Sequence, residues 1–176
     1  MTCQLGAIRR YTSGMSSLAA AETEVSLWRD IVILRRKIER ELEQRLQQDA
    51  GVSVADFEIL TTLCSAPDGR LRARDLADVL GWEKSRLSHQ VTRMEGRSLV
   101  ERQDCPTDLR GTWVTITDQG HAAAARGQDG YADVLATRFE VLDPAERTEL
   151  DSMARRVVEA TDPVVCKSAR EIFGES

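Results

Sequence analysis

The sequence lacks the features that identify membrane-spanning and secreted proteins. None of its apolar runs approaches the ~18 to 20 residues that cross a bilayer, which excludes a membrane-spanning protein. Arg9 and Arg10 near the N-terminus precede no apolar segment, so a secretory signal is not expected. A cytoplasmic protein of one ordinary domain with extensions is the resulting prediction.

Closely spaced metal ligands and catalytic motifs are also missing. The four cysteines (Cys3, Cys64, Cys105 and Cys166) are scattered, and only two histidines accompany them. A zinc site needs closer ligand pairs, so we expect reduced thiols, no metal and no cofactor. The sequence has neither a Gly-rich phosphate loop nor an H-E-x-x-H motif, and His121 has no matching nucleophile. We therefore do not expect an enzyme.

Charge is distributed unevenly along the chain. The formal net charge of -5 argues against a polyanionic partner if the chain is taken as a whole. The segment from Asp68 to Trp113, however, holds nine basic and eight acidic residues, so the acidic excess lies elsewhere. This asymmetry directs attention to the middle of the chain.

The N-terminal part divides into two segments. Residues 1–21 show no apolar period and are rich in small and polar residues, so we expect disorder there, and Met15 is a possible alternative start. From about Glu22 to Gln48, apolar residues recur at helical spacing. This pattern predicts a helix of about 27 residues, roughly 40 Å long, which is longer than a small domain needs.

The middle of the chain, residues 53–117, has the order helix, short strand, helix, helix and hairpin. Ser53-x-x-Asp56 is a capping box that opens the first helix, and Pro67-Asp68-Gly69 ends it. Residues 70–72 can form only a short strand, and a short helix over 75–80 ends at Gly81. A helix over 83–97 and a β-hairpin over 101–117 follow. This order predicts a winged helix-turn-helix.

Two further helices are expected over residues 118–162. Gly127 and Gly130 should weaken the first by about 1 kcal/mol each, so this helix can bend there. Asp143, Pro144 and Glu146 form a strong start signal for the second. Residues 163–176 are a tail. Because the helices over 22–50 and 118–162 carry apolar stripes that one domain cannot cover, we expect a homodimer of a mainly α, α+β fold.

The helix over 83–97 has two separate faces. At 100° per residue, one polar stripe collects Arg86, His89, Gln90, Arg93 and Arg97, side chains that hydrogen-bond base edges or phosphates. Leu87, Val91 and Met94 form a separate apolar stripe. A helix placed between a glycine turn and a wing, with such a polar stripe, is typical of major-groove recognition of double-stranded DNA.

The hairpin offers a second contact. Arg110 stands near its tip and Asp108 two residues earlier, so the carboxylate can hold the guanidinium for insertion into a minor groove, or the pair can simply shape the turn. Arg72, Arg74, Lys84 and Arg97 are candidate phosphate contacts.

Residues 75–120 resemble the DNA-binding core of the MarR family of dimeric transcriptional regulators. The matching motifs are LA-x-x-LG-(aromatic)-x-x-SRLS, LVER, D-x-R-G and T-D-x-G, and the segments around Leu27-Trp28-Arg29 and PDGRLR are similar to an actinobacterial-type branch. The resemblance implies a homodimeric regulator that acts as a ligand-responsive repressor on a pseudo-palindromic operator. It also implies a recognition helix made by Ser85, Arg86, Ser88, His89, Gln90 and Arg93, with Asp108 and Arg110 in the wing.

Two positions depart from the family pattern. Ser98 stands where glycine is usual, so either Ser98 or Gly96 must provide the left-handed cap after the recognition helix. Leu109 replaces a frequent second arginine of the wing, which should lower the salt dependence of binding by about one unit.

The family also responds to small phenolic or aromatic effectors, or to oxidation of a cysteine. Trp28 and Arg29 are the suggested effector contacts, as an aromatic wall and a carboxylate clamp, although dimer core and surface charge explain them more simply. Cys64, expected on the inner helix face, and Cys105 are weaker candidates for a thiol-based redox sensor. A winged-helix module that binds protein is a further alternative, and exposed apolar anchors on residues 83–97 would indicate it.

Overall fold

The computed structural model describes residues 5–104 and 112–161, with side chains for 22–103 and 112–161. The chain divides into two units, Met1–Arg40 and Glu41–Ser176. In chain order the elements are α1 (Leu5–Asp49), α2 (Val54–Ser65), the 3-10 turn η1 (Pro67–Gly69), β1 (Arg70–Arg72), α3 (Ala73–Leu80), α4 (Lys84–Glu95), β2 (Val100–Asp104), β3 (Thr112–Ile116), α5 (Asp118–Phe139) and α6 (Pro144–Thr161). This order confirms the mainly α winged-helix fold expected from the sequence.

Helix α1 begins earlier than the sequence pattern indicated. It starts at Leu5, within the segment 1–21 that was expected to lack regular structure. Ala19, Ala20 and Ala21 are strong helix formers, and no proline occurs in the segment, so local propensity allows the helix to continue without an apolar stripe. The domain boundaries drawn from the sequence remain predictions.

The start of α2 is set by the expected capping box. The Ser53 hydroxyl accepts a hydrogen bond from the Asp56 amide at 3.0 Å, and the Asp56 carboxylate accepts one from the Ser53 amide at 3.0 Å. Phe57, Leu60 and Leu63 are buried on the inner face of this helix. Two backbone amides at the helix start, which have no partner within the helix, are thereby hydrogen-bonded. The capping box thus fixes where α2 begins.

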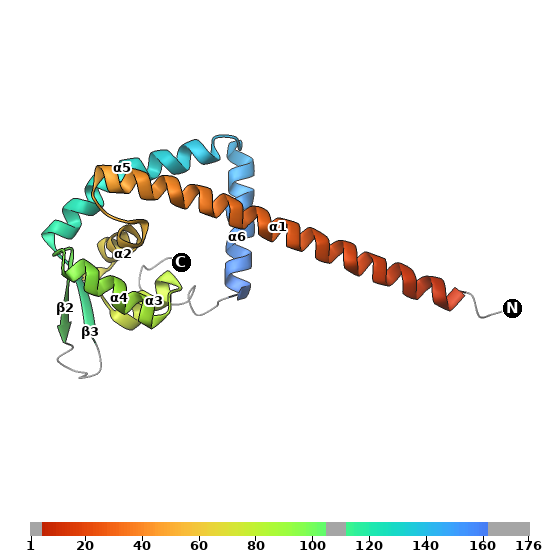
Figure 1. Ribbon diagram of the computed structural model, residues 1–176, viewed down its shortest axis with the longest axis horizontal. Coiled ribbons are helices and arrows are strands. Elements are labelled where there is room, and N and C mark those ends of the chain that lie inside the picture. Colours follow the sequence, from red (N-terminus) through yellow and green to blue (C-terminus); the bar gives the residue numbers. More distant parts are fainter. Residues whose placement is uncertain (1–4, 105–111, 162–176) are drawn as a thin grey trace. The chain divides into compact units, whose positions relative to one another are not determined.

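A three-stranded antiparallel sheet in the order β1-β3-β2 lies beside these helices. Leu71 pairs with Val114 in one ladder, and Arg102 pairs with Val114 in the other. Figure 1 shows α3 and α4 next to the β2–β3 hairpin, with α5 leading away from the end of β3. The strands thus form the base of the predicted wing, and α4 lies between the Gly81 turn and this wing.

The core of the second unit is formed by apolar side chains from the end of α1, from α2, α3, α4 and α5, and from the sheet. Its fully buried members include Leu46, Leu60, Leu76, Val91, Met94 and Val114. The Phe57 and Tyr131 rings meet at 4.9 Å between centroids, which joins α2 to α5. This core fixes the positions of the helices that carry the candidate site.

Helix α5 uses its glycines for close packing. It is one continuous helix through Gly127 and Gly130, and the bend expected there stays a prediction. A Cβ at Gly127 would lie 2.8 Å from both Leu46 and Phe57 side-chain atoms. Gly120 lies against the carbonyl oxygen of Leu99, which leaves no room for a side chain. The glycines weaken the isolated helix but allow it to approach its neighbours closely.

The end of the recognition helix settles which residue provides the left-handed cap. Ser98 has φ 55°, whereas the C-cap residue Gly96 has right-handed helical dihedrals. The Ser98 carbonyl accepts a hydrogen bond from the Thr117 hydroxyl at 2.6 Å. Ser98 therefore takes the conformation that glycine adopts at lower cost.

Within the described residues, none of the helices is both long enough and apolar enough to span a bilayer.

Candidate nucleic-acid interface

Helix α4 presents a continuous polar face to solvent. Its exposed residues are Lys84, Ser85, Arg86, Ser88, His89, Thr92 and Arg93. Leu87, Val91 and Met94 are buried on the opposite side, as the helical projection predicted. The exposed face offers guanidinium, ammonium, imidazole and hydroxyl groups, which can donate to phosphates and to base edges.

Gln90 differs from the sequence expectation. It lies on α4, but only 6% of its surface is exposed, and its amide donates to the Asp56 carboxylate at 2.5 Å. On the helical projection Gln90 lies at the border between the polar and apolar stripes, and a buried acceptor on α2 draws it inward. Gln90 is therefore not on the exposed face of α4, and its contact with DNA stays a prediction.

Arg97 is likewise engaged inside the protein. It lies beyond the end of α4 and donates to the Asp56 carboxylate at 2.8 Å and to the Gly51 carbonyl at 2.5 Å. Its side chain is 45% exposed, whereas the Asp56 side chain is 3% exposed. The ion pair neutralises a buried carboxylate, so the phosphate contact suggested for Arg97 competes with a structural role.

Trp82 orients Arg86, a role that the sequence did not assign to it. The guanidinium carbon of Arg86 lies 3.9 Å from the Trp82 ring centroid. Trp82 is half-buried against the core, and its amide donates to the Ala77 carbonyl at 2.9 Å. The indole therefore offers a fixed surface on which the guanidinium stacks. The only sequence signal was the aromatic residue immediately after the Gly81 turn.

The other basic residues expected near phosphates lie on β1 and at the starts of α3 and α4. Arg72 stacks over Trp113 at 5.5 Å, and Arg74 pairs with Asp78 at 3.8 Å. Lys84 is exposed at the first position of α4. The phosphate contacts proposed for these residues are untested and remain predictions.

Arg102 was not selected from the sequence, yet it connects the wing to α4. It pairs with Glu95 and donates to the Ser88 carbonyl at 2.8 Å and to the Thr92 hydroxyl at 3.0 Å. Because Arg102 lies on β2, these contacts hold the base of the wing against the recognition helix. A lone arginine in a strand gives no sequence signal for such a role.

The tip of the wing, including Cys105, Asp108, Leu109 and Arg110, lies outside the described residues. The strands on either side pair from Val100 with Ile116 to Asp104 with Thr112. The expected hairpin base is thus present, and the minor-groove role of Arg110 stays a prediction.

The suggested effector contacts lie on an exposed part of α1. Trp28 is 66% exposed, and Arg29 donates to the Ser26 hydroxyl at 3.1 Å. A cavity of about 540 Å³ lies instead between α2 and α5. It is lined by Phe57, Glu58, Thr61, Cys64, Ser65, His121, Ala124, Ala125, Gln128 and Tyr131.

Cys64 lines this cavity and is exposed, so its expected position on the inner face was wrong. It follows the buried Leu63 by one residue, which turns it from the core towards α5. Its sulfur lies 3.5 Å from His121 Nδ1, and partial burial raises the pKa of the thiol. A raised pKa lowers the thiolate fraction and disfavours a reactive redox sensor.

The protein-binding alternative can be weighed on the same geometry. In the part of the chain that the structure describes, the exposed large apolar side chains lie outside α4, so the recognition helix offers no anchor of the kind that protein-binding surfaces use. Among these residues no group of three or more His, Cys, Asp and Glu side chains could hold a metal ion.

Comparison with known proteins places this geometry in a family. The MarR family model matches residues 50–111. Sco3205, a MarR family transcriptional regulator from Streptomyces coelicolor solved in complex with DNA, is 34% identical, with a TM-score of 0.74 over 79% of this chain and 91% of that chain. AbsC, a MarR family transcriptional regulator from the same organism, is 34% identical, with a TM-score of 0.72 over 79% of this chain and 94% of that chain.

A mutant of MarR from E. coli, solved with operator DNA, shares the fold at 24% identity, with a TM-score of 0.70 over 77% of this chain and 96% of that chain. No curated protein matches the sequence. With the winged helix, the basic recognition face and a 34% identical relative matched over most of its length, the chain belongs to the MarR family of transcriptional regulators.

Proposed function

We propose that the protein is a homodimeric repressor that binds a pseudo-palindromic operator in double-stranded DNA and acts in the cytoplasm. The observation that carries the proposal is the exposed face of α4, where Arg86, His89 and Arg93 lie on one side of the helix and Lys84 is exposed at its first position. In this proposal α4 enters the major groove and the β2–β3 wing follows the adjacent minor groove. The relative Sco3205, solved in complex with DNA, supports DNA as the partner.

The second copy of the chain is supported by uncovered apolar side chains. On α1 they include Val25, Leu27, Trp28, Ile31, Ile33 and Leu34, and on α6 Leu150, Met153, Val157 and Val158. Trp28 and Val157 are each 66% exposed. Apolar rows of this size mark interaction surfaces, and a second copy covers both sets by two-fold symmetry. Trp28 is then part of the dimer contact.

Selection of bound sequences from a random duplex pool tests the proposal. We expect a two-fold symmetric consensus whose half-sites are ~10 base pairs apart, bound by a dimer. Affinity for the selected duplex at ~0.15 M salt should exceed that for random duplex by at least about a thousandfold. Equal affinity for both duplexes, or a monomer on light scattering of the complex, would contradict the proposal.

Arg110 provides a specific test of the wing. In the proposed complex its guanidinium enters the minor groove, so Arg110→Ala should weaken operator binding about tenfold while the melting temperature and dimer mass stay unchanged. Binding titrations with the selected duplex measure this change. Leu109→Arg is the matched gain-of-charge variant and should steepen the salt dependence by about one unit. A loss of fold on Arg110→Ala would assign the residue to the hairpin structure instead.

An aromatic or phenolic effector has a suitable cavity between α2 and α5. Phe57 and Tyr131 give it aromatic walls, and His121, Thr61 and Gln128 give it hydrogen-bonding groups. Such a mixture of apolar walls and a few polar groups is typical of small-molecule sites. A thermal-shift screen of aromatic acids and phenols tests the site, with His121→Ala and Arg29→Ala compared. A shift that disappears with His121→Ala alone supports the cavity, whereas one that disappears with Arg29→Ala supports the site on α1.

A further inference from the structure

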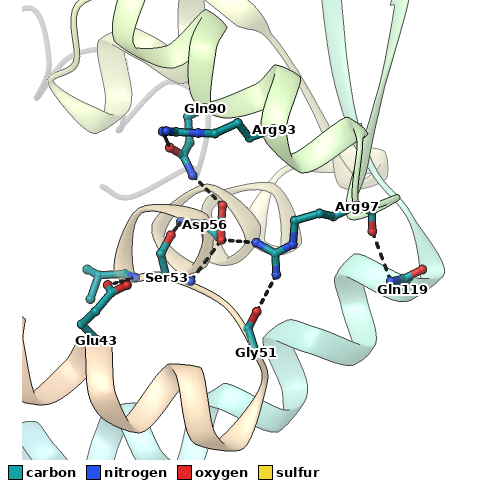
Figure 2. A network of polar contacts seen from close by, with 9 residues as sticks. Glu43, Gly51, Ser53, Asp56, Gln90, Arg93, Arg97 and Gln119 are labelled. Atoms are coloured by element: carbon teal, nitrogen blue, oxygen red, sulfur yellow. Dashed lines mark hydrogen bonds and ion pairs between the residues drawn. The ribbon is translucent and has the colours of Figure 1, made fainter.

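Asp56 is a buried carboxylate that reaches the recognition helix. It lies in the first turn of α2 and is only 2% exposed. Figure 2 shows it between Ser53 on one side and Gln90 and Arg97 on the other. One carboxylate oxygen, Oδ2, accepts from the Ser53 amide at 3.0 Å and from Arg97 at 2.8 Å. The other, Oδ1, accepts from Gln90 Nε2 at 2.5 Å.

This arrangement fixes the orientation of the Gln90 amide. An ionised carboxylate only accepts hydrogen bonds, so Gln90 must turn its NH2 group towards Asp56. Its oxygen Oε1 then points the other way, where it accepts a hydrogen bond from Arg93 Nη2. Arg93 is exposed on the polar face of α4. A chain of two hydrogen bonds therefore runs from a buried residue of α2 to a guanidinium on the recognition surface.

We propose that Asp56 is a positioning residue for DNA recognition, which acts through Gln90 to hold the Arg93 guanidinium in one pose before DNA arrives. This inference rests on the proposed function, since it assumes that the α4 face reads duplex DNA. A flexible arginine loses conformational freedom when it binds a base, and a fixed acceptor removes part of that loss beforehand. This chain of hydrogen bonds from Asp56 through Gln90 to Arg93, called the relay below, thus favours contacts with bases, which depend on geometry. Phosphate contacts tolerate many poses and gain less from it.

The variant Asp56→Asn reverses the relay with little change of shape. The Oδ2 position has two donors facing it, so the oxygen of the introduced amide must occupy it and the capping contact with Ser53 is kept. The NH2 group of the introduced amide then faces Gln90, which must turn its own oxygen towards it. Gln90 consequently presents an NH2 group to Arg93, and the guanidinium loses its acceptor.

Two further variants separate positioning from folding. Gln90→Met keeps the length of the side chain but removes both hydrogen bonds of the relay. Ser53→Ala removes the hydroxyl that accepts from the Asp56 amide at 3.0 Å, so it weakens the start of α2 without touching Gln90 or Arg93. The double variant Asp56→Asn with Gln90→Glu restores the relay, because the introduced amide donates to the introduced carboxylate and that carboxylate accepts from Arg93.

The measured quantity is the ratio of the dissociation constants for random and selected duplex, determined with the folded, full-length dimer. Asp56→Asn and Gln90→Met should each lower this ratio about tenfold, the cost of roughly one base contact, mainly by weakening binding to the selected duplex. Ser53→Ala should lower the melting temperature but leave the ratio unchanged. The double variant should recover most of the ratio.

The outcomes distinguish this inference from the proposed function. An unmodified protein that binds both duplexes equally overturns the proposed function, and the relay with it. If the unmodified protein clearly prefers the selected duplex and Gln90→Met keeps that preference, the relay alone is overturned. The same holds if Ser53→Ala lowers the ratio as much as Asp56→Asn, or if the double variant recovers nothing, because Asp56 would then act only through the stability of the fold.

Discussion

The guanidinium of Arg86 stacks on the indole of Trp82, with its central carbon 3.9 Å from the ring centroid. The two residues flank the start of α4, one in the turn after α3 and one in the first turn of the recognition helix. Because Trp82 is half-buried against the core, the ring is held in place while the guanidinium stays at the surface. Arg86 is thus preorganised by the turn of the helix-turn-helix itself.

Replacement of the indole should therefore weaken DNA binding through Arg86. A cation–π contact at an exposed site contributes about 0.5–1 kcal/mol, so Trp82→Leu should raise the Kd for the selected duplex about two- to fivefold. Trp82→Phe keeps an aromatic face and should have a smaller effect. The contact is isolated by repeating Trp82→Leu in an Arg86→Ala background, where it should change Kd no further. An equal loss in both backgrounds would mean that Trp82 acts on the fold.

Ser98 should be a site where one substitution stabilises the protein. Its φ of 55° costs a side-chain-bearing residue about 1 kcal/mol that glycine does not incur. Glycine has more freedom in the unfolded chain, so the net gain for Ser98→Gly is about 0.5 kcal/mol. Urea unfolding with a common slope measures this difference. Gly96→Ala is the control. Because Gly96 has right-handed dihedrals, this substitution should not incur the cost that a side chain incurs at a left-handed position.

The sequence predicted those parts of the fold that depend on local signals. The capping box of Ser53 and Asp56, the Gly81 turn and the apolar face of α4 are all encoded within a few residues, and each was confirmed. The sequence did not decide whether Gly96 or Ser98 provides the left-handed cap after α4. Backbone dihedrals at a helix end depend on where the next strand must run.

Features that depend on distant residues were missed. Gln90 lies at the border of the polar stripe, and its burial is decided by Asp56, which precedes it by 34 positions. Cys64 was placed on the wrong face because the border of an apolar stripe was again read from one helix alone. In each case the packing partner, and not the local pattern, determines which way the side chain points.

The glycines of α5 illustrate this in energetic terms. Helix propensity alone predicts that Gly→Ala stabilises a helix by about 1 kcal/mol. The close approach of neighbouring atoms predicts the opposite, a loss of about 1–3 kcal/mol from overpacking at Gly127, where Leu46 and Phe57 lie 2.8 Å from the added Cβ. Gly120→Ala should be worse, because its obstacle is the backbone of Leu99, which cannot rotate away.

Denaturant unfolding of the two variants, with Ala122→Gly as a control, checks this expectation. Ala122 is exposed, so Ala122→Gly reports helix propensity alone and should cost about 1 kcal/mol. The expected order of stability is wild type, Gly127→Ala and Gly120→Ala from highest to lowest. A stabilising Gly127→Ala would show that α5 can move away from α2 without loss.

Cys64 should react slowly despite its exposure. Partial burial raises the pKa of its thiol, so the thiolate fraction at neutral pH is smaller than that of a free cysteine, and alkylation is correspondingly slower. Iodoacetamide labelling, with each cysteine followed by peptide mass spectrometry, measures the rate. Cys64→Ser identifies the signal. A rate at pH 7 above that of free cysteine would revive the redox-sensor alternative, and His121 would be the group that activates the thiol.

The same shift predicts how stability depends on pH. A pKa raised in the folded state means that folding favours the protonated thiol. The stabilising contribution is therefore fully present below the pKa of the unfolded chain and is lost as the pH rises through the folded pKa. Burial also raises the pKa of Tyr131, and its contribution is lost at higher pH by the same argument. The free energy of unfolding should thus decline at alkaline pH. In Cys64→Ser the decline should begin at a higher pH, because Tyr131 is then the member of this pair that still titrates.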